Sequence, residues 1–243
     1  MTKKETKHLK TFCKQIRVSI IDLDLLKIAL THRSYINENR KTDLKHNERL
    51  EFLGDAVLEL LVSQHLFKTY PGKDEGELTS FRAATVRTES LYEEAKKLKM
   101  GDYIYMSKGE EQTGGRTRPY ILANTFEAVT GAIYIDRGLA ETEKFLKRDL
   151  YYKIPEIIEK RLDIDSKSKL QEVAQEILKE TPTYKIIDST GPDHAKHFIS
   201  QVQLKTKPFG KGKGLNKQEA EQNAAEDALT NWKELVSTYF GID

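Results

Sequence analysis

Residues Asn47–Leu60 read Asn-Glu-Arg-Leu-Glu-Phe-Leu-Gly-Asp-Ala-Val-Leu-Glu-Leu, and the interpretation of the whole chain starts from them. Glu48, Glu51 and Asp55 stand at i, i+3 and i+7, a spacing that a helix places along one face. The other positions are largely apolar: Leu50, Phe52, Leu53, Val57, Leu58, Leu60 and Leu61. Carboxylates on a largely buried helix need a compensating cation, and hard divalent cations take oxygen ligands. The stretch therefore predicts Mg²⁺-assisted chemistry, and a solvated acidic edge is the alternative that the spacing leaves open.

The bulk composition is that of a soluble, globular protein. The 243 residues, 38% hydrophobic and 32% charged, suffice for one large domain or two small ones. No apolar run approaches the roughly 20 residues of a membrane span, and Met1–Lys14 lacks the apolar core of a signal peptide. A lone cysteine, Cys13, excludes an internal disulfide and a cysteine-based zinc site, and fits a reducing compartment. We expect a cytoplasmic protein without a membrane segment.

Positive charge is concentrated near the C-terminus, although the net charge is only +2. Five lysines fall in one segment that contains no acidic residue before Glu219: Lys205, Lys207, Lys211, Lys213 and Lys217. A contact with a polyanion should therefore be local, and a solvated lysine-rich loop is the alternative.

The first 160 residues are expected to form an all-helical domain. A proline–glycine pair at positions 71 and 72 stops the second helix, because proline cannot continue the hydrogen-bond ladder. A short extended piece is expected only around Tyr103–Met106. The clearest helical segments are Leu23–Leu30, Glu48–Tyr70, Glu77–Leu98 and Leu122–Asp136.

A different pattern follows the short polar stretch 161–167, which we interpret as a linker. Ser168 is expected to open a helix, with Gln171 at capping-box spacing. Three extended segments come next, and the last helix begins after Asn216. The strands are expected at Tyr184–Asp188, around Phe198, Val202 and Leu204, and at Lys207–Gly214. The final helix should bury Ala220, Ala224, Ala228 and Trp232. The order α-β-β-β-α predicts a small α+β domain over residues 168–236.

Two sets of motifs resemble one known family. Asn47–Leu60 is similar to the signature helix of bacterial ribonuclease III. Gly114–Gly131, Gly-Gly-Arg-Thr-Arg-Pro-Tyr-Ile-Leu-Ala-Asn-Thr-Phe-Glu-Ala-Val-Thr-Gly, resembles the second active-site helix of that family with the loop before it. Residues 168–232 resemble a double-stranded-RNA-binding domain, on the landmarks Leu170-Gln171-Glu172, Gly191-Pro192-Asp193-His194 and Ala224-Ala225.

The resemblance implies a fold and an activity. It implies an all-α ribonuclease III catalytic and dimerisation domain over residues 1–160, linker 161–167, and an α+β double-stranded-RNA-binding domain over 168–236. The family cuts both strands of an RNA duplex, leaving 5′-phosphate and 3′-hydroxyl ends with a short 3′ overhang. It also implies ribosomal, messenger and transfer RNA precursors as substrates, a homodimer, and no small-molecule cofactor besides the metal.

The same resemblance assigns the metal site. Glu51, Asp55, Glu127 and position 124 form an inner cluster for Mg²⁺, for which Mn²⁺ is a possible substitute. The outer acidic positions are Glu48 and Glu75. We expect Glu51 and Glu127 to be direct ligands and Asp55 to hold water beside the metal. Asp55 and Glu127 should be the most sensitive to substitution.

Position 124 departs from the family, which usually has aspartate where this chain has Asn124. An amide oxygen can still bind Mg²⁺, but the site loses one negative charge and gains two donors. We expect weaker metal binding with activity retained. Two alternatives stay open: Asn124 contacts no metal, or the protein binds RNA duplexes with impaired or no cleavage. A helical phosphohydrolase acting on nucleotides is a third possibility, but it leaves residues 168–232 without a role.

Gly54 and Phe52 carry two further expectations. Glycine inside a helix costs roughly 1 kcal/mol relative to alanine, so another backbone is expected to pack closely against Gly54. Phe52 matches the aromatic dimer contact of the family, and an ordinary core phenylalanine is the alternative. His32 and His46 have no partner at ligand spacing and are interpreted as packing or hydrogen-bonding residues.

Three elements are suited to an RNA duplex, which presents 2′-hydroxyls in its minor groove and phosphates across its major groove. Polar side chains of one helix would reach hydroxyls, although Gln171 competes as a cap partner. The family commonly has two adjacent lysines where this chain has Lys217-Gln218, so the salt dependence of binding should be shallower. The candidate RNA-binding residues are Ser168, Gln171, Glu172, His194, Lys211, Lys213 and Lys217.

Overall fold

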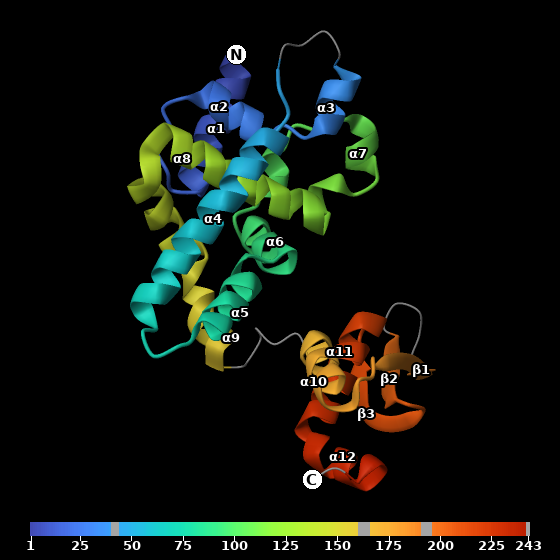
Figure 1. Ribbon diagram of the computed structural model, residues 1–243. Coiled ribbons are helices and arrows are strands. Elements are labelled where there is room, and N and C mark those ends of the chain that lie inside the picture. Colours follow the sequence, from blue (N-terminus) through green and yellow to red (C-terminus); the bar gives the residue numbers. More distant parts are fainter. Residues whose placement is uncertain (40–43, 160–165, 191–195, 242–243) are drawn as a thin grey trace. The chain divides into compact units, whose positions relative to one another are not determined.

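The computed structural model describes residues 1–39, 44–159, 166–190 and 196–241 (Figure 1). Contacts divide the chain into two compact units, Met1–Asp163 and Ile164–Asp243. Each unit has a hydrophobic core of its own.

The first unit is helical, as predicted. Its helices are α1 (Lys3–Gln15), α2 (Leu23–Ala29), α3 (Arg33–Glu38), α4 (Glu48–Thr69), α5 (Glu75–Val86), α6 (Thr88–Lys97), α7 (Lys108–Gln112), α8 (Pro119–Asp149) and α9 (Ile154–Glu159). Short 3₁₀ turns cover Met100–Tyr103, Gly115–Thr117 and Tyr151–Lys153.

One expectation for this unit was wrong, and another was confirmed only in part. The helix expected over Glu77–Leu98 is broken at Arg87, whose extended backbone (φ −61°, ψ 156°) separates α5 from α6. The extended piece expected around Tyr103–Met106 overlaps a 3₁₀ turn and pairs with the rest of the chain through a single bridge between Thr31 and Tyr105. Tyr105 N–H donates to the Leu30 carbonyl at 2.8 Å, and His32 N–H donates to the Tyr105 carbonyl at 2.9 Å. This bridge ties the loop before α7 to the start of α3.

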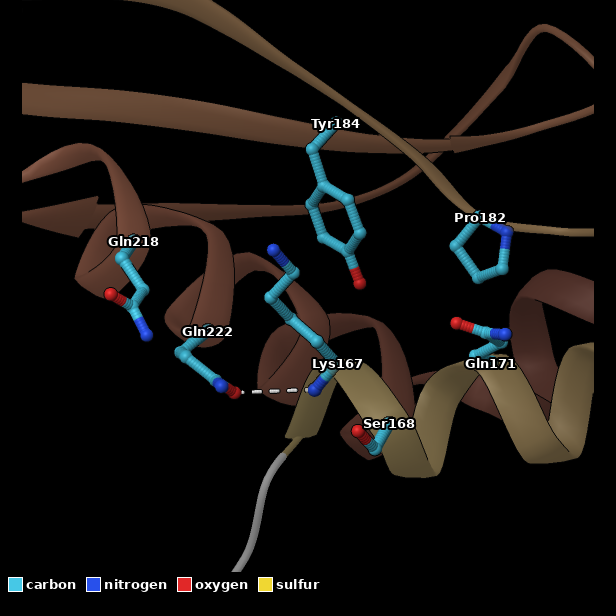
Figure 2. Close-up of a pocket in the computed structure, with 7 residues that line it drawn as sticks. All are labelled: Lys167, Ser168, Gln171, Pro182, Tyr184, Gln218 and Gln222. Atoms are coloured by element: carbon cyan, nitrogen blue, oxygen red, sulfur yellow. Dashed lines mark hydrogen bonds between the residues drawn. The ribbon is translucent and has the colours of Figure 1, made fainter. Parts of the chain in front are cut away.

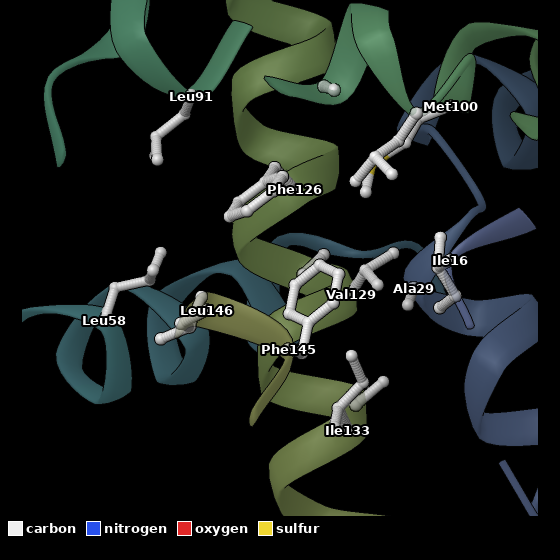
Figure 3. Packing of buried hydrophobic residues seen from close by; sticks show 14 of the residues in the cluster. Ile16, Ala29, Leu58, Leu91, Met100, Phe126, Val129, Ile133, Phe145 and Leu146 are labelled. Carbon is white, nitrogen blue, oxygen red and sulfur yellow. The ribbon is translucent and has the colours of Figure 1, made fainter. Parts of the chain in front are cut away.

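The long helices α4 and α8 form the centre of the first unit (Figure 1). They approach so closely that a Cβ on Gly54 would lie 1.8 Å from the Glu127 carbonyl oxygen. The predicted close backbone contact at Gly54 is thus confirmed. Helix α8 kinks at Gly138, whose φ of 76° lies in the left-handed region. The kink lets Phe145 return to the core beside Phe126, with ring centroids 5.4 Å apart (Figure 3).

The second unit has the predicted α-β-β-β-α order. It comprises α10 (Ser166–Leu178), β1 (Thr183–Thr190), β2 (His197–Leu204), β3 (Lys207–Gly214) and α11 (Lys217–Thr230), followed by α12 (Trp232–Phe240). The three strands form one antiparallel sheet in the order β1-β2-β3.

The start of α10 and the end of α11 differ from expectation. Helix α10 begins at Ser166, so it takes in Ser166 and Lys167 from the stretch interpreted as a linker, and Ser168 does not open it. The capping box expected between Ser168 and Gln171 is therefore absent. Trp232 starts the separate helix α12 instead of extending α11, and its ring lies 5.6 Å from that of Phe209.

Helix α11 lies directly on β3. Its residues Ala220, Ala224 and Ala228 are fully buried, as predicted. A Cβ on Gly212 would lie 2.1 Å from the Ala224 backbone nitrogen, so only glycine allows this approach. Asn216 caps α11 by accepting the Glu219 N–H at 2.9 Å, as the sequence predicted.

Candidate active site and RNA-binding surface

The acidic residues of α4 meet α8 at the point where the two helices are closest. Glu51 and Asp55 flank Gly54 on α4, and Glu127 is the α8 residue whose carbonyl faces Gly54. Asn124 lies one turn before Glu127 on α8. The structure thus brings together the four predicted inner residues from segments about 70 positions apart in the sequence, as the 73-residue separation of Glu51 and Asn124 shows.

Burial and mutual repulsion perturb these carboxyl groups. Burial, followed by the charges of Asp55 and Glu51, raises the pKa of Glu127 to about 8. Burial and the charge of Glu48 also raise the pKa of Glu51, although Asn124 opposes this shift by donating from Nδ2 to Glu51 Oε1 at 2.9 Å. Among the residues that the structure describes, no lysine or arginine forms an ion pair with Glu51, Asp55 or Glu127. Among the described residues the cluster therefore has no lysine or arginine partner that would favour ionisation of its carboxyl groups.

The donor set fits a hard divalent cation, since it offers carboxylate oxygens and one amide oxygen. Within the described ranges, however, no three Asp, Glu, His or Cys side chains form a group already placed to hold a metal ion. The amide nitrogen of Asn124 lies beside Glu51 in this arrangement, at 2.9 Å from Glu51 Oε1. For Asn124 to serve as a ligand there, its amide must turn so that Oδ1 replaces Nδ2.

A hollow of about 300 Å³ opens beside the acidic cluster. Side chains from α3, α4, the α7 segment and the start of α8 line it: His32, Arg33, Asn47, Glu48, Glu51, Glu110, Tyr120, Ile121 and Asn124. Glu48 stands at its edge, with its carboxylate 3.8 Å from both Arg33 Nη1 and His46 Nδ1. The hollow gives an extended ligand access to Glu51 and Asn124.

Glu75, the other outer acidic candidate, is not brought to this cluster within one chain. It begins α5 and lines a separate hollow of about 420 Å³ with Ser63, Phe67 and Arg82.

Sequence analysis left several residues of the first hollow unassigned to the site. Arg33, Glu110, Tyr120 and Ile121 were not singled out. His32 was interpreted as a packing or hydrogen-bonding residue, and it does form hydrogen bonds with Ser34. The bridge between Thr31 and Tyr105 helps to position His32, and no local pattern indicates that bridge. The Arg-Thr-Arg-Pro-Tyr run that leads into α8 was the available signal, because Arg118 pairs with Glu110 and donates to the Tyr120 hydroxyl at 3.2 Å.

The second unit carries a polar hollow of about 280 Å³ between α10, α11 and β1 (Figure 2). Ser168 and Gln171 of α10 face Gln218 and Gln222 of α11 across it, with Tyr184 of β1 above them (Figure 2). Gln218, which stands where the resemblance implies a second lysine, lines this hollow.

The remaining RNA-binding candidates lie apart from this hollow or are otherwise engaged. Glu172 is exposed and pairs with Lys169 at 2.9 Å. Lys211 and Lys213 alternate on β3 with the glycines that face α11, so their exposed side chains project from the opposite face of the sheet. Lys217 is the first residue of α11. His194 lies outside the described residues.

Phe52 is 80% exposed on α4, so the core alternative for this residue was wrong. Leu60 and Phe67 are also exposed, at 57% and 74%. With 100° per residue, the three lie within about 80° of one another around the helix and form an apolar stripe. We call Phe52, Leu60 and Phe67 the α4 stripe.

None of the helices in the described parts of the chain is long and apolar enough to cross a membrane.

Both units are similar to known proteins. A ribonuclease-III-like family model matches residues 22–154, and a double-stranded RNA binding motif matches residues 166–231. The "Ribonuclease 3" of Desulforamulus reducens is 50% identical over 205 residues, 84% of this chain and 83% of that protein. The "Ribonuclease 3" of Bacillus cereus is 48% identical over 237 residues, 96% of both chains. Among solved structures, the nuclease domain of ribonuclease III from Campylobacter jejuni matches with a TM-score of 0.56 at 37% identity, covering 60% of this chain and 99% of that one.

Proposed function

The chain belongs to the ribonuclease III family, and we propose that it is an Mg²⁺-dependent endoribonuclease that cuts both strands of double-stranded RNA. The observation that carries this proposal is the uncompensated carboxylate cluster between α4 and α8, in a chain that also holds a double-stranded RNA binding motif. A solvated acidic edge does not account for that cluster, because Glu51 and Glu127 are partly buried and their pKa values are raised.

The residues of the cluster take different roles. Glu51 and Glu127 would hold the cation through carboxylate oxygens, Asn124 would contribute its amide oxygen, and Asp55 would hold and orient the water that attacks the phosphorus. When bound, Mg²⁺ supplies charge neutralisation and lowers the pKa of water. Asp55 is exposed at the end of the cluster, where it is open to water. Glu48 stands further out and would contribute to the electrostatic field around the bound RNA strand.

The products and substrates follow the family. We propose 5′-phosphate and 3′-hydroxyl ends with a short 3′ overhang, and structured RNA precursors in the cytoplasm as substrates. The lone Cys13, a free thiol, fits that reducing compartment.

A homodimer is part of the proposal. Cleavage of both strands needs two sites, and each chain has one carboxylate cluster between α4 and α8. The α4 stripe leaves three large apolar side chains exposed on one chain, a surface that a second copy would cover. A solved relative at 37% identity is described as having a flexible region involved in dimer formation of its nuclease domain.

A long RNA duplex incubated with the full chain, with and without Mg²⁺, tests the function. The proposal predicts discrete short duplex products only when Mg²⁺ is present, and no cleavage of single-stranded RNA or of a DNA duplex of the same sequence. Asp55→Asn is the matched control and should leave the duplex intact. Cleavage that continues in excess chelator would contradict the proposal.

One observation favours a second function, a protein that binds RNA duplexes with impaired or no cleavage. Asn124 donates a hydrogen bond to Glu51, so the amide partly satisfies a carboxylate that a cation would otherwise neutralise. In the same assay, a shifted but uncut duplex at all Mg²⁺ concentrations would favour this function.

A further inference from the structure

His32 lines the first hollow, the one beside the acidic cluster. Glu48, Glu51 and Asn124 line the same hollow, together with Arg33 and Tyr120. Its backbone is fixed, because His32 N–H donates to the Tyr105 carbonyl at 2.9 Å. A half-buried histidine is thus held rigidly beside the proposed cleavage site.

Hydrogen bonds at Nδ1 determine which ring nitrogen carries the proton. Nδ1 accepts the backbone N–H of Ser34 at 3.3 Å and lies 2.8 Å from Ser34 Oγ. Ser34 Oγ itself accepts the Ser107 N–H at 3.1 Å, so its own hydrogen is free to point at Nδ1. Nδ1 is therefore an acceptor, and in the neutral ring the hydrogen resides on Nε2.

The surroundings keep the ring neutral. Burial lowers the pKa of His32. The charged groups that face it oppose one another, since Glu110 and Glu48 raise the pKa while Arg33 and Arg118 lower it. With Nδ1 engaged by Ser34, the edge of the ring that carries Nε2–H is the one left for a ligand in the hollow.

We propose that His32 is a substrate-binding residue, which donates from Nε2–H to a non-bridging phosphate oxygen of the RNA strand held at the acidic cluster. This inference rests on the proposed function of that cluster. The hollow has the volume of a small-ligand site, at the lower end of the usual range of about 300–1,000 Å³, and suits one sugar–phosphate unit. Phosphate oxygens only accept hydrogen bonds, and a neutral donor meets them without forming an ion pair with Glu48 or Glu51.

Arg33 supplies the positive charge next to this donor. Its Nη1 is 3.8 Å from Glu48 and its side chain is 70% exposed, so the ion pair between them is weak. Arg33 can therefore turn to a phosphate that passes Glu48.

Two substitutions separate this role from a purely structural one, because His32 also caps α3. His32→Asn keeps a favourable cap for the Ser34 N–H but is too short to donate into the hollow. His32→Gln places an N–H donor near the position of Nε2 but loses the Nδ1 acceptor. His32→Asn thus retains the acceptor that caps α3, and His32→Gln retains the donor near the position of Nε2.

Cleavage of a defined RNA duplex by the full chain gives the first readout. We expect His32→Asn to lower kcat/KM by roughly tenfold to a hundredfold, the effect of losing one hydrogen bond to a charged group, and His32→Gln to keep most of the rate. His65→Gln is the control, since His65 is half-buried on the same helix as Glu51 but stacks on Tyr151 at 4.3 Å. Parental activity in His32→Asn, or an equal loss in His32→Gln, would overturn the proposal.

A second readout does not depend on cleavage. In ¹⁵N-histidine-labelled full chain without metal, the ring signal that disappears in His32→Gln belongs to His32. We expect the neutral Nε2–H form at pH 7.5 and a shift of that signal when an RNA duplex is added. A charged ring, an Nδ1–H form or no response to RNA would overturn the proposal for His32. Failure of the unsubstituted chain to cleave would instead count against the proposed function.

Discussion

Ionisation of Glu127 is unfavourable, because the residue is partly buried and lies near Asp55 and Glu51. Its folded pKa of about 8 lies above the ordinary value of 4.5, so ionisation costs more in the folded chain than in the unfolded one. The folded state therefore loses stability as the pH rises from about 4.5 through 8. A cation bound to the cluster would recover that loss.

Glu127→Gln should remove this pH dependence, because glutamine does not ionise. In chelator, the Tm of the variant should exceed that of the unsubstituted chain by a margin that grows from pH 5 to pH 9 and reaches about 4 °C or more. Differential scanning calorimetry measures it. Glu59→Gln, an exposed carboxylate of the same helix, is the control and should show no such trend. A Tm difference that stays constant with pH would mean that the surroundings of Glu127 do not disfavour its ionised form.

Residue spacing predicted part of this site. The positions of Glu51, Asp55 and Glu127 follow from helical periodicity and from the family motif. The hydrogen bond from Asn124 to Glu51 and the place of His32 do not, because each depends on segments distant in the sequence. The local sequence around each residue therefore does not indicate these contacts.

At the scale of elements, the close contact between α4 and α8 depends on a glycine in each helix, Gly54 and Gly131. Gly54→Ala would place a methyl group 1.8 Å from the Glu127 carbonyl oxygen and 2.6 Å from its carbon, both backbone atoms. Since neither helix can yield by a side-chain rotation, we expect a loss of about 3 kcal/mol despite the higher helix propensity of alanine. Chemical denaturation of the full chain measures it.

Gly109→Ala is the matched control for this prediction, because Gly109 is also helical and no atom lies within 4 Å of its Cβ position. That variant should be neutral or slightly stabilised. Equal stability of the Gly54 and Gly109 variants would show that α4 and α8 are not in backbone contact.

Element boundaries were harder to predict than element types. The break at Arg87 and the separation of α12 from α11 involve no proline or glycine at the junction. The start of α10 at Ser166 lies within a polar stretch whose composition favours a linker. Propensity alone does not reveal these boundaries.

At the scale of the whole molecule, the α4 stripe predicts self-association. Phe52→Glu would place a charge in an apolar interface and should shift the protein from dimer to monomer in sedimentation velocity experiments. Ile21→Glu is the control, since Ile21 is 73% exposed and lies outside the stripe. A Phe52→Glu dimer as tight as the parent would contradict the assignment of this surface.

We propose the cluster between α4 and α8 as the metal-dependent cleavage centre. The rate of duplex cleavage as a function of Mg²⁺ concentration tests it most directly, measured for the unsubstituted chain, Asn124→Asp and Asp55→Asn. We predict that Asn124→Asp reaches its half-maximal rate at lower Mg²⁺, because it restores a negative charge and removes the donor to Glu51. Asp55→Asn should not cleave at any concentration. Superimposable titrations for all three proteins would contradict the claim.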